Sequence, residues 1–138
     1  MSAFEIRGID HVVLRCTDVQ AMLNFYCGVL GCTVAKNNER LGLLHLRAGT
    51  TMIDLVDIRG TIERPGGLAP SAERPNMDHF CLRIEPFDLE RLGAHLRSHG
   101  IEPGEPRTRF GAEGDGPSVY LQDPEGNRVE LKGPSKVA

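Results

Sequence analysis

One short phrase occurs twice in this chain of 138 residues, and it constrains the fold more than any other feature. Asp10-His11-Val12-Val13-Leu14-Arg15 returns 68 residues later as Asp78-His79-Phe80-Cys81-Leu82-Arg83. A repeat at a fixed spacing in so short a chain indicates two copies of one supersecondary unit. Each copy places a histidine in a strand-like run, so two related strands can bring two imidazoles together, as a metal site requires.

The residues that follow each phrase predict the same order of elements: a strand, a helix and three strands. In the first half we expect a strand at 9–15, a helix from Asp18 to Gly31, and strands at about 32–36, 41–47 and 51–57. In the second half we expect a strand at 77–84, a helix from Asp88 to Gly100, and strands at about 105–110, 117–122 and 128–132. The pattern predicts an α+β fold of two modules, at about 7–58 and about 77–133.

Three connecting segments have compositions of their own. Residues 59–76 are rich in proline and glycine and predict a linker. Residues 111–116 contain three glycines and predict a second flexible loop. Asp123-Pro124-Glu125-Gly126-Asn127 predicts a tight hairpin, because proline pre-sets the second turn position and glycine tolerates a positive φ.

Composition narrows the functional class. A net charge of −3 argues against nucleic-acid binding, and no apolar run approaches the ~20 residues of a membrane span. No secretory signal is visible at the N-terminus. The four cysteines, Cys16, Cys27, Cys32 and Cys81, form no C-x-x-C pair and are expected to be reduced thiols. We therefore expect one domain over 1–138 in the cytoplasm, acting on a small molecule without nucleic-acid or membrane partners.

The last strand of each half carries a carboxylate between apolar neighbours, Asp54 in the first and Glu130 in the second. Strand alternation places both on the face opposite the helices, together with His11 and His79. A carboxylate on such a face is costly unless it is paired or bound to a metal. Two imidazoles and two carboxylates suit Fe(II), Ni(II), Mn(II), Co(II) or Zn(II). Asp54 is the shorter carboxylate by one methylene, which leaves direct binding, binding through water and no contact with the metal as alternatives.

Other polar residues near these positions have simpler interpretations. Asp10 and Asp78 are expected to pair with Arg15 or Arg83, and these arginines share the histidine faces, where they can hold an anionic substrate. Tyr120, on an adjacent strand, can donate a hydrogen bond to the site. The other histidines, His45, His95 and His99, have no counterpart at the repeat spacing, and for His95 and His99 a solvated helix face is the expected location.

Four motifs carry a family resemblance: Ile9-Asp10-His11-Val12, Asn24-Phe25-Tyr26 leading to Val29-Leu30-Gly31, Met77-Asp78-His79, and Asp123-Pro124-Glu125-Gly126-Asn127 running into Glu130. Together they resemble the vicinal oxygen chelate superfamily of glyoxalase I, bleomycin-resistance proteins, fosfomycin-resistance enzymes and extradiol dioxygenases. The resemblance covers residues 7–132 and implies two tandem βαβββ modules that form a half-open mixed β-sheet barrel around a metal site. The stretch from Pro106 to Leu121 is similar to glyoxalase-domain-containing proteins.

The resemblance also implies residue roles. His11, His79 and Glu130 take the positions of metal ligands, and Asp54 takes the position that glutamate fills in glyoxalase I. One divalent ion, Ni, Zn, Mn or Fe, would bind two adjacent oxygens of a small substrate. Glu130 would then serve as ligand and base and Tyr120 as a hydrogen-bond donor, with Arg15 and Arg83 binding the substrate.

The reaction remains open between several classes. A glyoxalase-type isomerase or lyase, with glutathione as a possible co-substrate, is the first expectation. The alternatives are an Fe(II) extradiol-type dioxygenase, a fosfomycin-type thiol transferase and a non-enzymatic antibiotic-binding protein. A half-open sheet leaves unpaired edges, so we also expect a homodimer, with the modules paired within a chain or across the two-fold axis.

Overall fold

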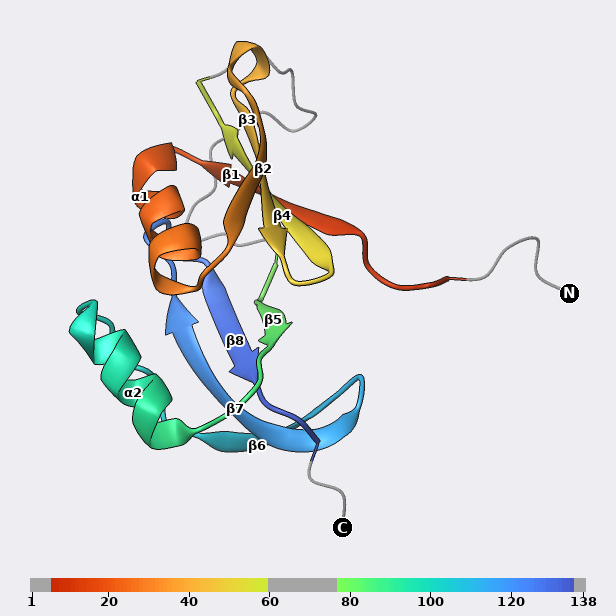
Figure 1. Ribbon diagram of the computed structural model, residues 1–138, viewed down its shortest axis with the longest axis vertical. Helices are drawn as coiled ribbons and strands as arrows, with labels where there is room; N and C mark the ends of the chain where they lie inside the picture. Colours follow the sequence, from red (N-terminus) through yellow and green to blue (C-terminus); the bar gives the residue numbers. More distant parts are fainter. Residues whose placement is uncertain (1–5, 60–76, 136–138) are drawn as a thin grey trace, which may run out of the picture. The chain divides into compact units, whose positions relative to one another are not determined.

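Two compact units, residues 1–70 and 71–138, make up the protein (Figure 1). The computed structural model describes residues 6–59 and 77–135. Residues 60–76 of the expected linker lie outside the described residues. The expectation of a single domain stays a prediction. None of the described helices is long and apolar enough to cross a membrane.

The first unit is a four-stranded mixed sheet with one helical segment. Its elements are β1 (His11–Cys16), α1 (Val19–Leu23), the π-helical η1 (Asn24–Val29), β2 (Thr33–Asn38), the 3-10 turn η2 (Glu39–Leu41), β3 (Leu43–Ala48) and β4 (Thr51–Asp57). The strand order is β1-β4-β3-β2, with β1 parallel to β4 and the other neighbours antiparallel. Alternate β4 residues Ile53 and Leu55 are buried, and α1 contacts this strand.

The predicted helix is present between its expected ends. The Asp18 carboxylate accepts from the Ala21 amide at 3.0 Å, and Gly31 takes a φ of +83° that glycine adopts without strain. The second half of the helix is π-helical, which the sequence pattern did not predict. Within this segment the neighbouring residues Phe25 and Tyr26 are both buried.

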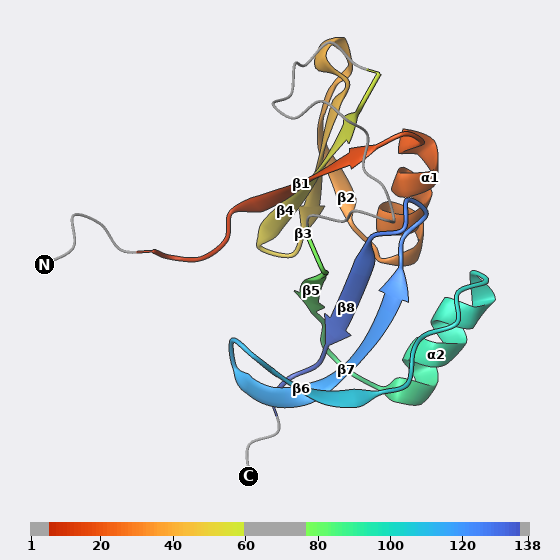
Figure 2. The ribbon, with the colours of Figure 1, turned by 180° about the vertical axis from the view of Figure 1, so that it is seen from behind.

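The second unit repeats the architecture. Its elements are β5 (Phe80–Arg83), α2 (Leu89–Ser98), β6 (Arg107–Gly111), β7 (Gly114–Gln122) and β8 (Arg128–Lys132). The strand order is β5-β8-β7-β6, again with one parallel pair, and Figure 2 shows β8 between β5 and β7. Asp88 caps α2 through the Arg91 amide. The predicted α+β fold of two βαβββ modules is therefore confirmed, and each sheet is open rather than a closed barrel.

The prediction of a flexible loop at 111–116 was wrong, because these residues form the tip of the β6–β7 hairpin. Gly111 pairs with Gly114 across a two-residue turn, and Gly114 has a φ of +100°. Glycine also leaves space here, since a Cβ at Gly111 or Gly116 would lie 3.1 or 3.0 Å from atoms of the Lys132 side chain. The glycines thus serve close packing rather than flexibility.

The hairpin at residues 123–127 joins β7 to β8 as predicted. Asp123 Oδ1 accepts from the amides of Glu125 and Asn127 at 2.9 and 2.8 Å, and Asp123 Oδ2 accepts from Asn127 Nδ2 at 2.8 Å. Gly126 has a φ of +86°. The Asp123 carboxylate therefore holds the turn that sets the β7–β8 register.

We expect Asp123→Ala to lower the free energy of unfolding by about 2–3 kcal/mol, because it removes three hydrogen bonds to a buried charged acceptor. Asp88→Ala, which removes a single exposed cap, should cost about 1 kcal/mol. Urea denaturation of both variants checks the order. An Asp123 variant no less stable than the Asp88 variant would contradict this account of the turn.

Candidate functional site

Each module places one carboxylate at the same point of its sheet. Val13 of β1 stands opposite Asp54 of β4, and Cys81 of β5 stands opposite Glu130 of β8. His11 and His79 each lie two residues before the paired position and so on the same face, although His79 precedes β5 rather than lying within it. Asp54 and Glu130 are both only 5% exposed.

In the second unit, both ring nitrogens of His79 face carboxylates. Nδ1 lies 2.6 Å from Asp78 Oδ2 and Nε2 lies 3.1 Å from Glu130 Oε1. An ionised Asp78 can only accept, so Nδ1 carries a proton, and the hydrogen bond to His79 lowers the pKa of Asp78. A neutral ring would then direct its Nε2 lone pair at another acceptor. The pair therefore needs a proton or a metal ion between nitrogen and oxygen.

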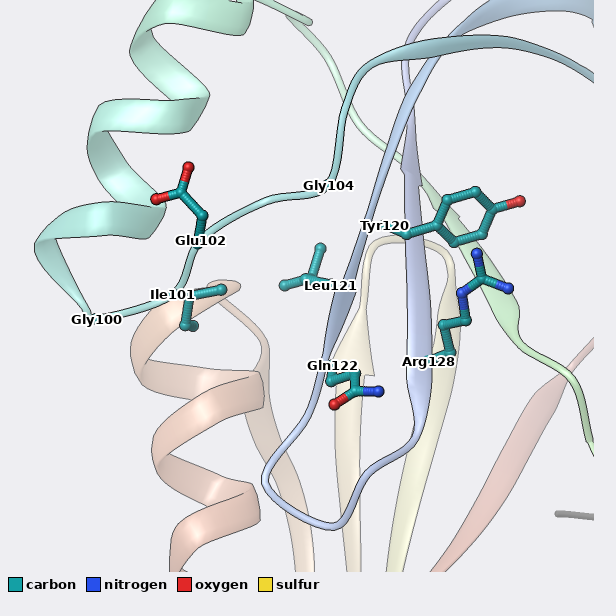
Figure 3. A pocket seen from close by; sticks show the side chains of 8 residues that line it. All are labelled: Gly100, Ile101, Glu102, Gly104, Tyr120, Leu121, Gln122 and Arg128. Carbon is teal, nitrogen blue, oxygen red and sulfur yellow. The ribbon is translucent and has the colours of Figure 1, made fainter. Parts of the chain in front are cut away.

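Tyr120 of β7 completes this arrangement. It stands opposite Glu130 in the register, and its ring lies 5.2 Å from that of His79. Desolvation, followed by hydrogen bonding to the Glu130 carboxylate, raises the pKa of Tyr120, so the phenol stays protonated and donates. The Arg128 guanidinium lies 4.0 Å from the centre of the Tyr120 ring, on the side of β7 away from Leu121 (Figure 3). Arg128 also approaches Asp78 at 3.8 Å.

In the first unit, the corresponding residues form two pairs. His11 Nδ1 lies 2.7 Å from Asp10 Oδ1, and this hydrogen bond is the main reason that the pKa of His11 is raised. His45 Nδ1 lies 3.0 Å from Asp54 Oδ1, yet that contact lacks hydrogen-bond geometry. Asp54 Oδ1 is therefore buried without a hydrogen-bond partner among the described residues.

His45 was set aside in the sequence as a histidine without a repeat counterpart, and this was wrong. His45 stands opposite Asp54 in the β3–β4 register, just as Tyr120 stands opposite Glu130 in the β7–β8 register. The separation of 75 residues differs from the 68 of His11 and His79 because the connecting segments differ in length. Alignment by element order rather than by fixed offset is the signal that finds His45.

The aspartates and arginines are paired differently from the prediction. Asp10 and Asp78 contact their neighbouring histidines instead of Arg15 or Arg83. Arg83 binds Glu113 and Glu85. Arg15 Nε is buried and has no hydrogen-bond partner within the described part of the chain, so substrate binding by Arg15 stays a prediction.

A cavity of about 320 Å³ opens beside the His79–Glu130 pair. Its lining mixes charged, apolar and thiol groups: His79, Cys81, Arg83, Phe110, Gly111, Ala112, Glu113, Glu130 and Lys132. Desolvation and the neighbouring Glu130 carboxylate raise the pKa of Cys81 to about 11, so this residue presents a thiol rather than a thiolate at neutral pH. The groups at the cavity that can bind a metal ion are therefore the imidazole nitrogen of His79 and the carboxylate oxygens, rather than a thiolate.

The buried polar atoms without hydrogen-bond partners lie on the corresponding faces of the two sheets. Among the described residues they are Arg15 Nε, Asp54 Oδ1 and Ser118 Oγ. Each belongs to the histidine-bearing face of its sheet, since Arg15 alternates with His11 and Ser118 alternates with Tyr120. Buried polar atoms without hydrogen-bond partners are rare in proteins, so these three mark the histidine-bearing faces as unusual.

The separation of His79 Nε2 and Glu130 Oε1 fits two neighbouring ligands of one metal ion. Two ligands bound side by side at about 2.1 Å from one ion lie roughly 3.0 Å apart, close to the 3.1 Å that separates Nε2 and Oε1. Because Asp78 engages Nδ1, Nε2 is the nitrogen left for coordination. Within the described residues, no three His, Cys, Asp or Glu side chains form a group placed to hold one ion. The full predicted set of His11, Asp54, His79 and Glu130 stays a prediction.

Comparison with known proteins identifies the family. The family model of the Glyoxalase/Bleomycin resistance protein/Dioxygenase superfamily matches residues 8–131. A glyoxalase domain-containing protein of Mycosarcoma maydis is 32% identical over 91% of this chain and 68% of its own length. A catechol-2,3-dioxygenase of Bacillus subtilis is 28% identical over 94% of this chain, which spans 42% of that protein.

A solved structure agrees with these matches. An integron cassette protein from the mobile metagenome of V. Pseudocholerae is 27% identical, covers 98% of this chain and 100% of its own, and has a TM-score of 0.77. Because the family model spans nearly all of the sequence, this chain belongs to the Glyoxalase/Bleomycin resistance protein/Dioxygenase superfamily.

Proposed function

We propose that this protein is a metal-dependent enzyme that acts on a small molecule with two adjacent oxygens. The His79–Glu130 pair carries the proposal, because a buried carboxylate faces the imidazole nitrogen that Asp78 leaves available for coordination. His11 is proposed as the third ligand and Asp54 as the fourth. Members of the superfamily commonly bind a divalent metal ion, and this donor set suits Ni, Zn, Mn or Fe.

The best-supported reaction is a glyoxalase-type isomerisation, a lyase or isomerase activity in which glutathione serves as co-substrate. When bound, the divalent ion supplies Lewis-acid stabilisation of negative charge on the substrate oxygens. Glu130 takes a proton from one carbon and returns it to the next, while the Tyr120 hydroxyl donates to the same carboxylate. Asp54 supports this choice, since its unpartnered buried oxygen provides a second carboxylate at the equivalent position of the repeat.

An Fe(II) dioxygenase is the second candidate. The 28% identity to a catechol-2,3-dioxygenase over 94% of this chain favours it. In that case His11, His79 and Glu130 hold the ion without Asp54, which leaves room for a diol and dioxygen. The two candidate reactions differ in whether Asp54 binds the metal ion.

A homodimer is proposed in either case, as is a cytoplasmic location. β1 lies at the edge of its sheet, and the apolar residues Ile9, just before the strand, and Val13, within it, are 73% and 42% exposed. Apolar residues along an open edge favour coverage by another chain.

We expect His79→Ala to lower the affinity for Zn(II) by more than about a hundredfold, because it removes one of three strong ligands. His95→Ala, which changes an exposed histidine of α2, serves as the matched control and should bind like the parent. Isothermal titration of metal-free protein measures both. Equal Zn(II) affinity in the His79 variant and the parent would rule out this ligand.

Asp54→Asn distinguishes the two reactions. For an isomerase we expect the rate on the methylglyoxal–glutathione hemithioacetal to fall by about a hundredfold or more, since a catalytic carboxylate is lost. The fold should be retained, because the Asp54–His45 contact lacks hydrogen-bond geometry. Anaerobic and aerobic assays with the hemithioacetal and with catechol provide the readout. Oxygen-dependent catechol cleavage that survives Asp54→Asn would replace the isomerase proposal with the dioxygenase.

We expect sedimentation at micromolar concentration to show a species of twice the 15.1 kDa chain mass. A single 15.1 kDa species across that range would argue against the dimer.

A further inference from the structure

We propose that Lys132 is an anion-binding residue of the cavity and that the substrate carries a carboxylate in addition to its two adjacent oxygens. The part that concerns the adjacent oxygens rests on the proposed function, whereas the anion site does not. Lys132 lies on β8, two residues after Glu130 and therefore on the same face. Its side chain lines the 320 Å³ cavity together with His79 and Glu130.

Lys132 is buried and makes no direct ion pair within the described residues, although its charge acts on the Glu113 carboxylate of the same cavity at longer range. It is only 4% exposed, and no carboxylate of the described residues lies within ion-pair distance of its ammonium. Buried lysines are almost always paired, because an ammonium withdrawn from water loses its hydration. A charge kept at such a cost beside a cavity is explained by an anion that enters the cavity.

The protein holds this side chain in a fixed place. A Cβ at Gly111 would lie 3.1 Å from Lys132 Cε, and one at Gly116 would lie 3.0 Å from Lys132 Nζ. The β6–β7 hairpin thus forms a glycine-lined channel along the lysine side chain. This channel restricts the ammonium to one region at the cavity and reduces the entropy that ligand binding would otherwise cost.

Arg83 is the other cation of the cavity, and its donors are already engaged. Nε donates to Glu113, Nη1 to the Ile84 carbonyl at 2.9 Å, and Nη2 to Glu85 Oε1 at 3.0 Å. The pairing with Arg83, with a smaller contribution from Lys132, lowers the pKa of Glu113 and keeps it ionised. Lys132 is therefore the better candidate for the role that the sequence suggested for Arg83.

A hydroxyl group beside Lys132 also lacks a partner. Ser118 of β7 stands opposite Lys132 in the register, is fully buried, and its Oγ has no hydrogen-bond partner among the described residues. Because Ser118 is fully buried and does not line the cavity, the contact with the anion falls to the Lys132 ammonium alone. We infer a singly charged carboxylate, because one cation is available for it.

Two pairs of neutral and anionic probes test the proposal. Calorimetry compares 3,4-dihydroxybenzoate with its neutral isostere 3,4-dihydroxybenzamide on Zn(II)-loaded protein. NMR titration compares benzoate with benzamide on metal-free protein, where no chelation contributes. We expect the parent to bind each carboxylate about tenfold more tightly than the matching amide. Lys132→Met should bind the members of each pair equally and retain the parent's amide affinity within about twofold.

The controls separate the two proposals. Lys36→Met, which changes an exposed lysine of β2, should keep the carboxylate preference. The melting temperature of Lys132→Met should equal or exceed that of the parent, because an unpaired buried charge is removed. If neither diol binds but benzoate is preferred only when Lys132 is present, the proposed function fails and the anion site stands. A carboxylate preference that survives Lys132→Met, or is absent from the parent in both probe pairs, overturns the anion site.

Discussion

The burial of one carboxylate in the middle of each sheet is the constraint on which the rest of the structure depends. Asp54 and Glu130 are each 5% exposed on interior strands, where an uncompensated charge is costly. The register meets that cost by placing a partner on the same face, His45 beside Asp54 and His79 beside Glu130. In both pairs a ring nitrogen lies 3.0–3.1 Å from a carboxylate oxygen, a separation that a shared proton or a bound cation can fill.

The two modules share a plan and differ in detail. The second module builds a connected set around Glu130, with an imidazole, a phenol and a thiol on one face and a cavity beside them. The first module keeps the carboxylate but replaces the phenol by His45, whose ring lies 3.0 Å from Asp54 Oδ1 without hydrogen-bond geometry. In the proposed site the second module supplies His79 and Glu130, while the first supplies His11 and the second carboxylate, Asp54. Lys132, which has no charged counterpart at Val56, adds an anion site to the second module alone.

The repeat allowed the module order, both helix caps and the 123–127 hairpin to be predicted, because each depends on local physical chemistry. The π-helical segment was missed because burial of two adjacent aromatic residues is a tertiary effect. The hairpin at 111–116 was missed because glycines that make room for Lys132 have the same local signature as flexible glycines. His45 was missed because the spacing between equivalent residues changes along the chain as the connecting segments differ in length.

The central claim is that His79 and Glu130 coordinate one divalent ion. Anomalous diffraction from crystals grown with Zn(II) tests it most directly, since it locates the ion independently of any assay. The account predicts one peak per chain within about 2.0–2.2 Å of His79 Nε2 and a Glu130 oxygen. A peak elsewhere, for example between the exposed His95 and His99 rings of α2, with nothing at His79, would contradict it.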